Sequence, residues 1–449
     1  MLMVVVPWER SRGMGSSKAT TLIVAANIVV YLYTSYRNMF LESTNESIYA
    51  LGFIPALLFT DPLQGVVRIF TAMFTHADFF HIFFNMYFLW LFGRRIESVI
   101  GSRRYLLLYF ASGLAAVLFH VAIIPVGGYD SLVVPAVGAS GAISGVLGAY
   151  LLLFPYARLM WCMFFLFLPY CFPVSTAVFL IIWFAEQVLY GYMRLGGVAY
   201  FAHVGGFVAG LALTYVLTRG LVEHYRLNYT YDYIARWLQE IGIVVRKPRG
   251  LGGVAKAVLT VLLVLVAAGF AYSVYYTVAS PPSTYLLSVT ANNASDTVSL
   301  VVYRGSVEVS FSSMDYVRIL LNRIQTFLYN PSAAGESVEY THPIFVYVEG
   351  LPVPVNPQVS AVYDEAGVIK RGSGVIETRI VIANIYGGAR IGGSIKIAFE
   401  LSTTRIDTAP VLSIAGVMAL SITAYSLLSL RRADEIAVVG EEYVETSFL

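Results

Sequence analysis

Long apolar runs recur along the chain and are separated by short polar segments. A helix needs about 20 apolar residues to cross the hydrocarbon core of a bilayer. Eight runs approach this length, and we expect each of them to form a transmembrane helix. The runs are 19–36, 79–98, 104–124, 139–155, 173–192, 200–219, 254–278 and 409–430.

Two further apolar segments are interrupted by residues that do not suit a continuous span. Segment 51–74 contains Pro55, Asp61, Pro62 and Arg68, so we interpret it as a partly inserted loop. Segment 158–172 contains a proline and precedes another, and we expect an interfacial or re-entrant link there.

Residues 279–408 follow a different pattern, in which apolar and polar positions alternate. Runs such as TVSLVVYRGSVEVSF and SIKIAFEL have the period of strands, whereas MDYVRILLNRIQTFLY (314–329) has helical spacing. We therefore expect a β-rich (α+β) domain outside the membrane, held between the seventh and eighth spans. The remaining segments are a short N-terminal segment (1–18), a basic linker (220–253) and a tail (431–449).

Composition strengthens the membrane interpretation. The 449 residues are 58% apolar and only 12% charged, whereas soluble domains carry about 25% charged residues. The net charge of +2 gives no argument for nucleic acid as a partner. The two cysteines, Cys162 and Cys171, lie in an apolar segment and are interpreted as ordinary apolar residues, without a metal set or a disulfide framework.

The positions of basic residues predict the orientation, because Lys and Arg gather on the cytoplasmic side of spans. If the N-terminus is cytoplasmic, all clusters near span ends face the cytoplasm, and so does the C-terminus. The loop 125–139 and the domain 279–408 then lie outside, in a protein of the cell membrane. The clusters are Arg10, Arg12 and Lys18; Arg94, Arg95, Arg103 and Arg104; Arg158; Arg226, Arg236, Arg246, Lys247, Arg249 and Lys256; and Arg431 and Arg432.

Four polar residues inside the apolar runs are candidates for function, because polar groups are costly in a membrane. His81 and Asn85 are four residues apart, so both lie on one face of the second span. The alternative is that they form a hydrogen-bonded pair that only joins helices. Ser140 and His203 lie near the predicted outer ends of the fourth and sixth spans.

Glycines at spacings of four predict close packing of the fourth and sixth spans. Gly141 and Gly145 follow Ser140, and Gly206 and Gly210 follow His203. Close packing along these two stripes brings the Ser140 hydroxyl toward the His203 imidazole. The alternative for Ser140 is a small residue used only for packing.

The four polar residues together supply the groups that acyl transfer needs. A serine hydroxyl becomes a nucleophile when a base such as a neutral imidazole lies within about 3 Å. A tetrahedral oxyanion needs hydrogen-bond donors, and His81, Asn85 and the backbone N–H of Ser140 are available.

The same segments resemble the rhomboid intramembrane serine proteases over about residues 19–219. The segments are HADFFHIFFNMYFLWLFGRRIE (76–97), GASGAISGVLGAY (138–150) and AHVGGFVAG (202–210). The resemblance implies an all-α polytopic membrane protein with a six-helix bundle. Here the bundle is followed by two extra transmembrane helices that flank the β-rich domain.

The resemblance also implies roles for individual residues. Ser140 is then the nucleophile and His203 the base of a dyad without a third acid, with no cofactor and no metal. His81 and Asn85 line the oxyanion site together with Gly138, which belongs to the loop that shapes it. Gly141, Gly206 and Gly210 pack helices, and His76 matches a second histidine with a structural role.

The chain departs from the family pattern at two positions. The first outer loop has Val67-Arg68 where a Trp-Arg pair is common, and Ser144 stands where an aromatic residue packs on the histidine in some members. Support for His203 must therefore come from elsewhere. Glu186, beside Gln187 in the fifth span, is expected to reach the outer interface or to hydrogen-bond between helices. The alternative is that it forms part of a water-filled gate near this span.

The sequence thus predicts an endopeptidase that cuts transmembrane protein substrates near the outer face of the bilayer. The domain 279–408 is a candidate site for an unknown protein partner. One alternative is a non-catalytic protein of the same fold that binds and escorts transmembrane segments. A channel or transporter is disfavoured because we see no inverted repeats and few charged groups along the spans. A metalloprotease is disfavoured because His76 and His81 lack the H-E-x-x-H arrangement.

Overall fold

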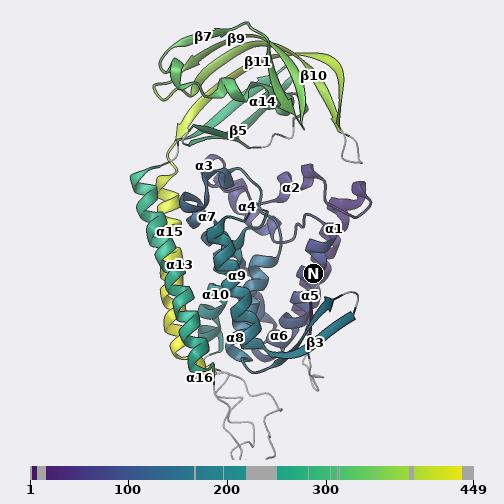
Figure 1. Cartoon of the computed structure of the whole chain (residues 1–449), viewed down its shortest axis with the longest axis vertical. Helices are drawn as coiled ribbons and strands as arrows, with labels where there is room; N and C mark the ends of the chain where they lie inside the picture. The colour runs from purple at the N-terminus through teal and green to yellow at the C-terminus, as the bar shows by residue number, and fades with distance from the viewer. Residues whose placement is uncertain are drawn as a thin grey trace, which may run out of the picture.

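The structure, a computed structural model, shows a helical bundle with a β-rich region above it (Figure 1). It describes residues 3–7, 17–165, 168–195, 197–218 and 250–436, except for 282, 304, 311, 313, 349 and 384–388. Most of the expected N-terminal segment 1–18, linker 220–253 and tail 431–449 lies outside the described residues.

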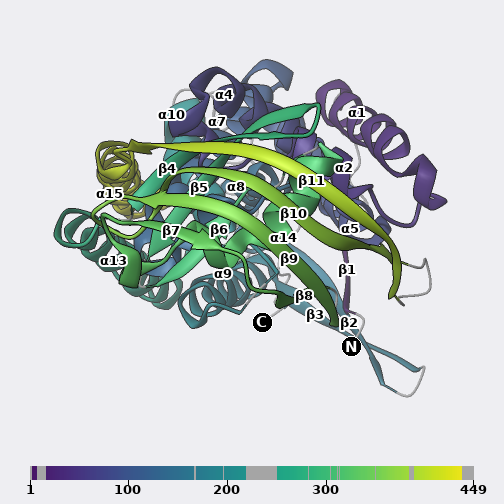
Figure 2. The ribbon, with the colours of Figure 1, turned by 90° about the horizontal axis from the view of Figure 1, so that it is seen from above.

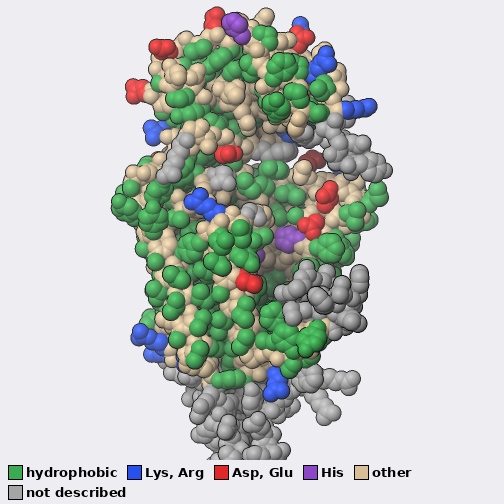
Figure 3. All heavy atoms as spheres, in the orientation of Figure 1, with side chains coloured by type: hydrophobic (Ala, Val, Ile, Leu, Met, Phe, Trp, Pro, Cys, Tyr) green, Lys and Arg blue, Asp and Glu red, His purple; other side chains and the backbone are tan. Residues whose placement is uncertain are grey.

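The bundle contains several helices that are long and apolar enough to cross a membrane. Among the described residues, six helices meet this description by length and composition. Figure 3 shows that apolar side chains dominate the middle of the bundle on the face in view. The expectation of a multi-pass membrane protein is confirmed, while the count of six spans plus two stays a prediction. The six helices are α1 (Lys18–Ser35), which η1 (Tyr36–Asn38) extends, α7 (Ser102–Gly127), α9 (Thr176–Met193), α10 (Tyr200–Thr218), α13 (Gly253–Ala279) and α15 (Ala409–Arg431).

Two of the expected spans, 79–98 and 139–155, fall outside that description. The first is interrupted: α5 (Phe79–Phe88) continues through a π-helical turn, η2 (Leu89–Gly93), into α6 (Arg94–Ile100). The second, α8 (Ser140–Leu153), has only 14 residues and is therefore about 21 Å long. All of its residues after Ser140 are buried. Since protein rather than lipid surrounds α8, the helix does not need the length of a lipid-facing span.

Glycines allow α8 and α10 to pack with their backbones in contact. A Cβ atom on Gly206 would overlap the carbonyl oxygen of Gly141, and one on Gly210 would overlap that of Gly145. On the other side of α8, a Cβ on Gly145 would overlap Ser112 of α7. The small residues that are spaced four apart in the sequence therefore lie where α8 meets α10 and α7.

A buried carboxylate joins α6 to the beginning of α1. Glu97 is 1% exposed and accepts hydrogen bonds from the backbone N–H groups of Ala19 and Thr20 at 2.9 and 2.8 Å. The Ser102 hydroxyl donates to the same carboxylate at 2.6 Å. Glu97 therefore satisfies N–H groups that the first turn of a helix leaves without partners.

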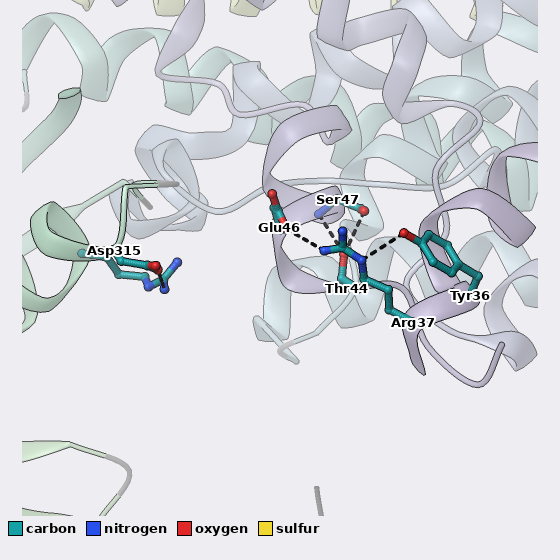
Figure 4. Close-up of polar contacts among 7 residues, drawn as sticks. Tyr36, Arg37, Thr44, Glu46, Ser47 and Asp315 are labelled. Carbon is teal, nitrogen blue, oxygen red and sulfur yellow. Dashed lines mark hydrogen bonds and ion pairs between the residues drawn. The ribbon is translucent and has the colours of Figure 1, made fainter. Parts of the chain in front are cut away.

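The segment between α1 and α5 is more helical than the loop expected at 51–74. Asp61 accepts a hydrogen bond from the N–H of Gln64 at 3.2 Å, and Pro62 occupies the first turn that follows. Proline is tolerated there because that N–H has no partner inside the helix. The helices are α2 (Asn45–Leu51), α3 (Leu57–Thr60) and α4 (Pro62–Ala72). Upstream, the Arg37 side chain of η1 contacts the hydroxyl of Tyr36 and the carboxylate of Glu46, which lies in α2 (Figure 4).

The two cysteines form a disulfide, which corrects the expectation that they are ordinary apolar residues. Segment 158–175 is an antiparallel hairpin of β2 (Arg158–Phe165) and β3 (Leu168–Ser175), extended by β1 (Met3–Pro7). The register places Cys162 opposite Cys171, and the two are bonded. The run is almost uniformly apolar and has no period of two, so the hairpin register could not be anticipated.

The β-rich region is one antiparallel sheet that curves over the bundle (Figure 2). Its strand order is β6-β5-β4-β11-β10-β9-β7, and β8 also pairs with β9. Helix α14 (Asp315–Leu328) packs its apolar face on the sheet, so the two share one core. A separate β-rich region is thereby confirmed. The strands are β4 (Ser283–Ala291), β5 (Ala294–Tyr303), β6 (Ser306–Val309), β7 (Ser337–Tyr340), β8 (Ile344–Val348), β9 (Leu351–Tyr363), β10 (Ile369–Ala383) and β11 (Ala389–Ile406).

Helices α13 and α15 connect the β-rich region to the bundle. The Ser426 hydroxyl of α15 donates to the carbonyl of Val208 at 2.7 Å, and the Ser273 hydroxyl of α13 donates to the carbonyl of Ala122. At the boundary, the Tyr303 ring of β5 lies 4.5 Å from the Tyr129 ring. The β-rich region therefore rests on the same end of the bundle at which α8 begins.

Candidate active site

Ser140 is the first residue of α8 and follows a sharp loop. Gly138 has a φ of +120°, which L side chains rarely adopt. A Cβ atom on Gly138 would also lie 2.7 Å from Nε2 of His81. Glycine is thus required at 138 for two reasons. The turn places Ser140 at the N-terminal end of α8.

His203, in the first turn of α10, meets Ser140 directly. Its Nε2 atom lies 2.8 Å from Oγ of Ser140. The two residues belong to the helix pair whose glycines bring the backbones together. The structure therefore places the two predicted dyad residues within hydrogen-bond distance.

The other ring nitrogen of His203 contacts a residue that the sequence reasoning did not name as part of the site. Nδ1 lies 2.8 Å from Oε1 of Gln187 in α9. Gln187 is 8% exposed, and the Trp183 ring lies beside the imidazole with centroids 6.3 Å apart. Gln187 is a polar residue in an apolar helix, which is the same signal that marked the other candidates. The adjacent Glu186 carries a charge and is the more conspicuous residue in the sequence, but its side chain is exposed.

Ser144 does not take the place of an aromatic residue beside His203. Its hydroxyl donates to the carbonyl of Ser140, one turn back in α8, at 2.7 Å. The support that the sequence left open comes instead from α9, through Gln187 and Trp183.

His81 and Asn85 lie on the side of the site that faces the Gly138 turn. The His81 imidazole approaches Gly138, and its Nδ1 accepts a hydrogen bond from the N–H of Ala77 at 3.4 Å. Nε2 of the neutral ring then carries the proton and is available as a donor. The Asn85 side-chain amide donates to the carbonyl of His81 at 2.8 Å. Asn85 therefore supports the helix turn that presents His81 in this structure.

His76 holds the loop between α4 and α5. Its Nε2 atom accepts a 3.5 Å hydrogen bond from the N–H of Ala139. Burial, together with the nearby His81 imidazole, lowers the pKa of His76 to about 3, so the ring is neutral near pH 7. These contacts fit a structural role, because His76 fixes the chain immediately before Ser140.

A cavity of about 880 Å³ joins these residues. Ser140, His203, His81 and Asn85 all line it, and so do the polar side chains of Asp78, Ser131 and Arg194. His120 of α7 also lines the cavity and was not anticipated, because a single histidine in an apolar run has no motif around it. Among the described residues, no group of three or more His, Cys, Asp or Glu is placed to hold a metal ion.

The first-loop arginine lies apart from the dyad. The Arg68 guanidinium donates to the carbonyl of Tyr49, which ties α4 to α2, and Val67 is half exposed. The position where a tryptophan is common in the family thus carries a side chain on the surface of α4.

Comparison with known proteins places this site in a recognised domain. Residues 63–220 match the model of the Rhomboid domain. Rhomboid protein 1, mitochondrial, of Saccharomyces cerevisiae is 30% identical over 170 residues, which are 37% of this chain and 46% of the yeast protein. Rhomboid-like protease 3 of Toxoplasma gondii is 25% identical over 45% of this chain and 70% of that protein. Rhomboid protease GluP of Bacillus subtilis is 32% identical over 30% of this chain and 25% of its own length. The match thus spans less than half of the yeast and Bacillus proteins.

Proposed function

We propose that this chain, which belongs to the rhomboid family, is an intramembrane serine endopeptidase that hydrolyses peptide bonds in or next to transmembrane segments. The observation that carries the proposal is the 2.8 Å distance between Oγ of Ser140 and Nε2 of His203, inside a cavity between membrane-span-capable helices. The Toxoplasma and Bacillus relatives are proteases by their names.

The first half of the reaction forms an acyl-enzyme. Ser140 Oγ attacks the carbonyl carbon of the scissile bond while its proton passes to Nε2 of His203. The tetrahedral intermediate then collapses, the C–N bond breaks, and Nε2 gives the proton to the leaving amine. Ser140 now carries the acyl group as an ester.

The second half consumes one water. His203 takes a proton from water, the hydroxide equivalent attacks the ester carbonyl, and the proton returns to Ser140 Oγ as the C–O bond breaks. Polar side chains of the cavity, among them His120 and Ser131, offer hydrogen bonds to such a water.

Charge on the carbonyl oxygen needs donors in both halves. The His81 imidazole and the backbone N–H of Ser140 flank the Gly138 turn and supply them. The N-terminal end of α8 adds a favourable electrostatic contribution because the helix dipole is positive there. Asn85 contributes by holding the turn that carries His81.

The shortness of α8 favours a site below the membrane surface. A helix of 14 residues covers about 21 Å, whereas the hydrocarbon core is about 30 Å thick. If its C-terminal end reaches the inner boundary, Ser140 lies some 9 Å beneath the outer one. We propose that the protein lies in the cell membrane. Following the distribution of basic residues, we expect both termini in the cytoplasm and the cavity open to the outside.

The β-rich region stands above the bundle (Figure 1), and its Tyr303 ring contacts Tyr129 in the loop that leads to Ser140. We propose that it lies outside the membrane and binds a protein partner of unknown identity. The contact between this region and Tyr129 supports a partner site close to the mouth of the cavity.

A fluorophosphonate probe tests the function, since it reacts with an activated serine and not with an inert one. We expect wild-type protein to be labelled and Ser140→Ala to be unlabelled. Ser144→Ala is the matched control, because it removes a hydroxyl one turn away that donates to the Ser140 carbonyl. Absence of labelling in folded wild-type protein would favour the alternative of a non-catalytic protein that binds and escorts transmembrane segments.

A further inference from the structure

We propose that Gln187 is a positioning residue that fixes the tautomer and orientation of the His203 imidazole, while Ser140 and His203 alone carry out the proton transfer. This inference rests on the proposed function, because it assigns a role within the same site.

The two hydrogen-bond partners of His203 determine which nitrogen of its imidazole carries the proton. Gln187 Oε1 lies 2.8 Å from Nδ1 of His203. A carbonyl oxygen only accepts, so Nδ1 must carry the hydrogen in this arrangement. Nε2 is then the bare nitrogen, and it is the atom 2.8 Å from the Ser140 hydroxyl. Without a partner at Nδ1, the ring would be free to place its proton on Nε2, where it could not accept from serine.

Packing holds Gln187 in place for this task. Phe184, one turn earlier in α9, is fully buried and stacks on Phe207 of α10 with ring centroids 4.5 Å apart. Trp183 also contacts Phe207, at 5.8 Å. These rings fix α9 against α10 at the level of His203, and they leave the Gln187 amide facing the imidazole.

Gln187 lies on a different helix from the two dyad residues. Ser140 and His203 come from helices whose backbones touch through glycine. Gln187 comes from a third helix, which also packs against α13 through a hydrogen bond from the Tyr192 hydroxyl to the Leu265 carbonyl at 2.9 Å. A change at Gln187 can therefore alter the imidazole without altering the helix contact that sets the Ser140–His203 distance.

A neutral amide suits the surroundings of this ring. The other titratable or charged side chains that line the same cavity are Asp78, His81, His120, Arg194 and Tyr200. An amide orients the imidazole without adding a charge to this set. A carboxylate at 187 would keep the hydrogen bond and would also stabilise the imidazolium. An amide and a carboxylate at position 187 therefore predict different pH profiles of activity, which can be measured.

The test compares three variants in cleavage of a transmembrane substrate and in fluorophosphonate labelling. Gln187→Met keeps the side-chain length and removes the acceptor, and we expect kcat to fall about tenfold to a hundredfold with little change in KM. In Gln187→Glu, we expect activity to be retained and the acidic limb of the kcat/KM profile to move to higher pH. Glu186→Met is the matched control, because its side chain is exposed on the same helix, and we expect wild-type kinetics and pH profile.

Two results separate the proposals. If the wild type cleaves and labels, but Gln187→Met has the wild-type kcat and Gln187→Glu has the wild-type pH profile, the role of Gln187 is wrong while the proposed function stands. If folded wild type neither cleaves nor labels, the proposed function itself is wrong. Should Gln187→Met fail to fold, the pH profile of Gln187→Glu decides alone.

Discussion

The hydroxyl of Ser140 and Nε2 of His203 lie 2.8 Å apart, although the residues are 63 positions apart in the sequence. The contact depends on two helices, α8 and α10, that approach each other through Gly141 and Gly206. The chemistry of the site is therefore coupled to the packing of residues that carry no functional group.

Gly206→Ala should damage the site without touching a reacting atom. Its new Cβ would overlap the Gly141 carbonyl, so α10 must move away from α8 and take His203 with it. We expect a loss of about 1–3 kcal/mol in stability together with a strong loss of serine labelling. Thermal denaturation and fluorophosphonate labelling measure the two effects. Gly253→Ala is the control, since nothing lies within 4 Å of that position, and equal behaviour of the two variants would contradict the packing account.

His81→Ala should lower the rate of the chemical step rather than substrate binding. Removing one oxyanion donor typically lowers kcat by about 10²–10³, and His81 is the side chain that faces the Gly138 turn. Steady-state kinetics on a transmembrane substrate separates kcat from KM. A normal kcat in this variant would show that the oxyanion is stabilised elsewhere.

Removal of the β-rich region should leave the bundle folded. The strands that leave α13 and enter α15 begin and end side by side, since the Thr284 and Thr408 hydroxyl oxygens lie 3.5 Å apart. Replacing 283–406 with a short Gly/Ser linker therefore keeps both helices in place, and serine labelling should persist. Deletion of 250–449 is the comparison, and it should destabilise the bundle because it removes Ser273 and Ser426 from their contacts. Equal melting temperatures of the two deletions would contradict this view of α13 and α15.

Glu97→Ala should loosen the first helix. The substitution leaves the N–H groups of Ala19 and Thr20 buried without their acceptor, which typically costs about 1–3 kcal/mol. Thermal denaturation and limited proteolysis near residue 18 report the effect. Glu46→Ala is the control, because Glu46 is exposed and pairs with Arg37 at the surface; a similar loss in both variants would speak against the capping role.

The sequence was sufficient for features that have a period or a motif. Apolar runs of membrane length, alternating strands and glycines four residues apart each depend on nearby positions, so they could be read directly. Ser140, His203 and His81 were found because polar groups are rare in apolar helices and because three motifs resemble one family. The structure then placed all three around one cavity.

Features that depend on contacts between distant segments could not be predicted. The partner of His203 is Gln187, and which face of α9 meets α10 is decided by the packing of Phe184 on Phe207. The disulfide of Cys162 with Cys171 required a hairpin register that a uniformly apolar run does not encode. In both cases the residue types were visible and their geometry was not.

The central claim, that Ser140 is a nucleophile activated by His203, is tested most directly by reconstitution. Purified wild-type protein and Ser140→Ala are placed in liposomes with a single-span substrate rich in Gly, Ala and Ser around its outer end, and products are mapped by mass spectrometry. The account predicts one or a few cuts near the outer membrane boundary by the wild type and none by Ser140→Ala. Cleavage by pure Ser140→Ala at the wild-type sites and rate would contradict it.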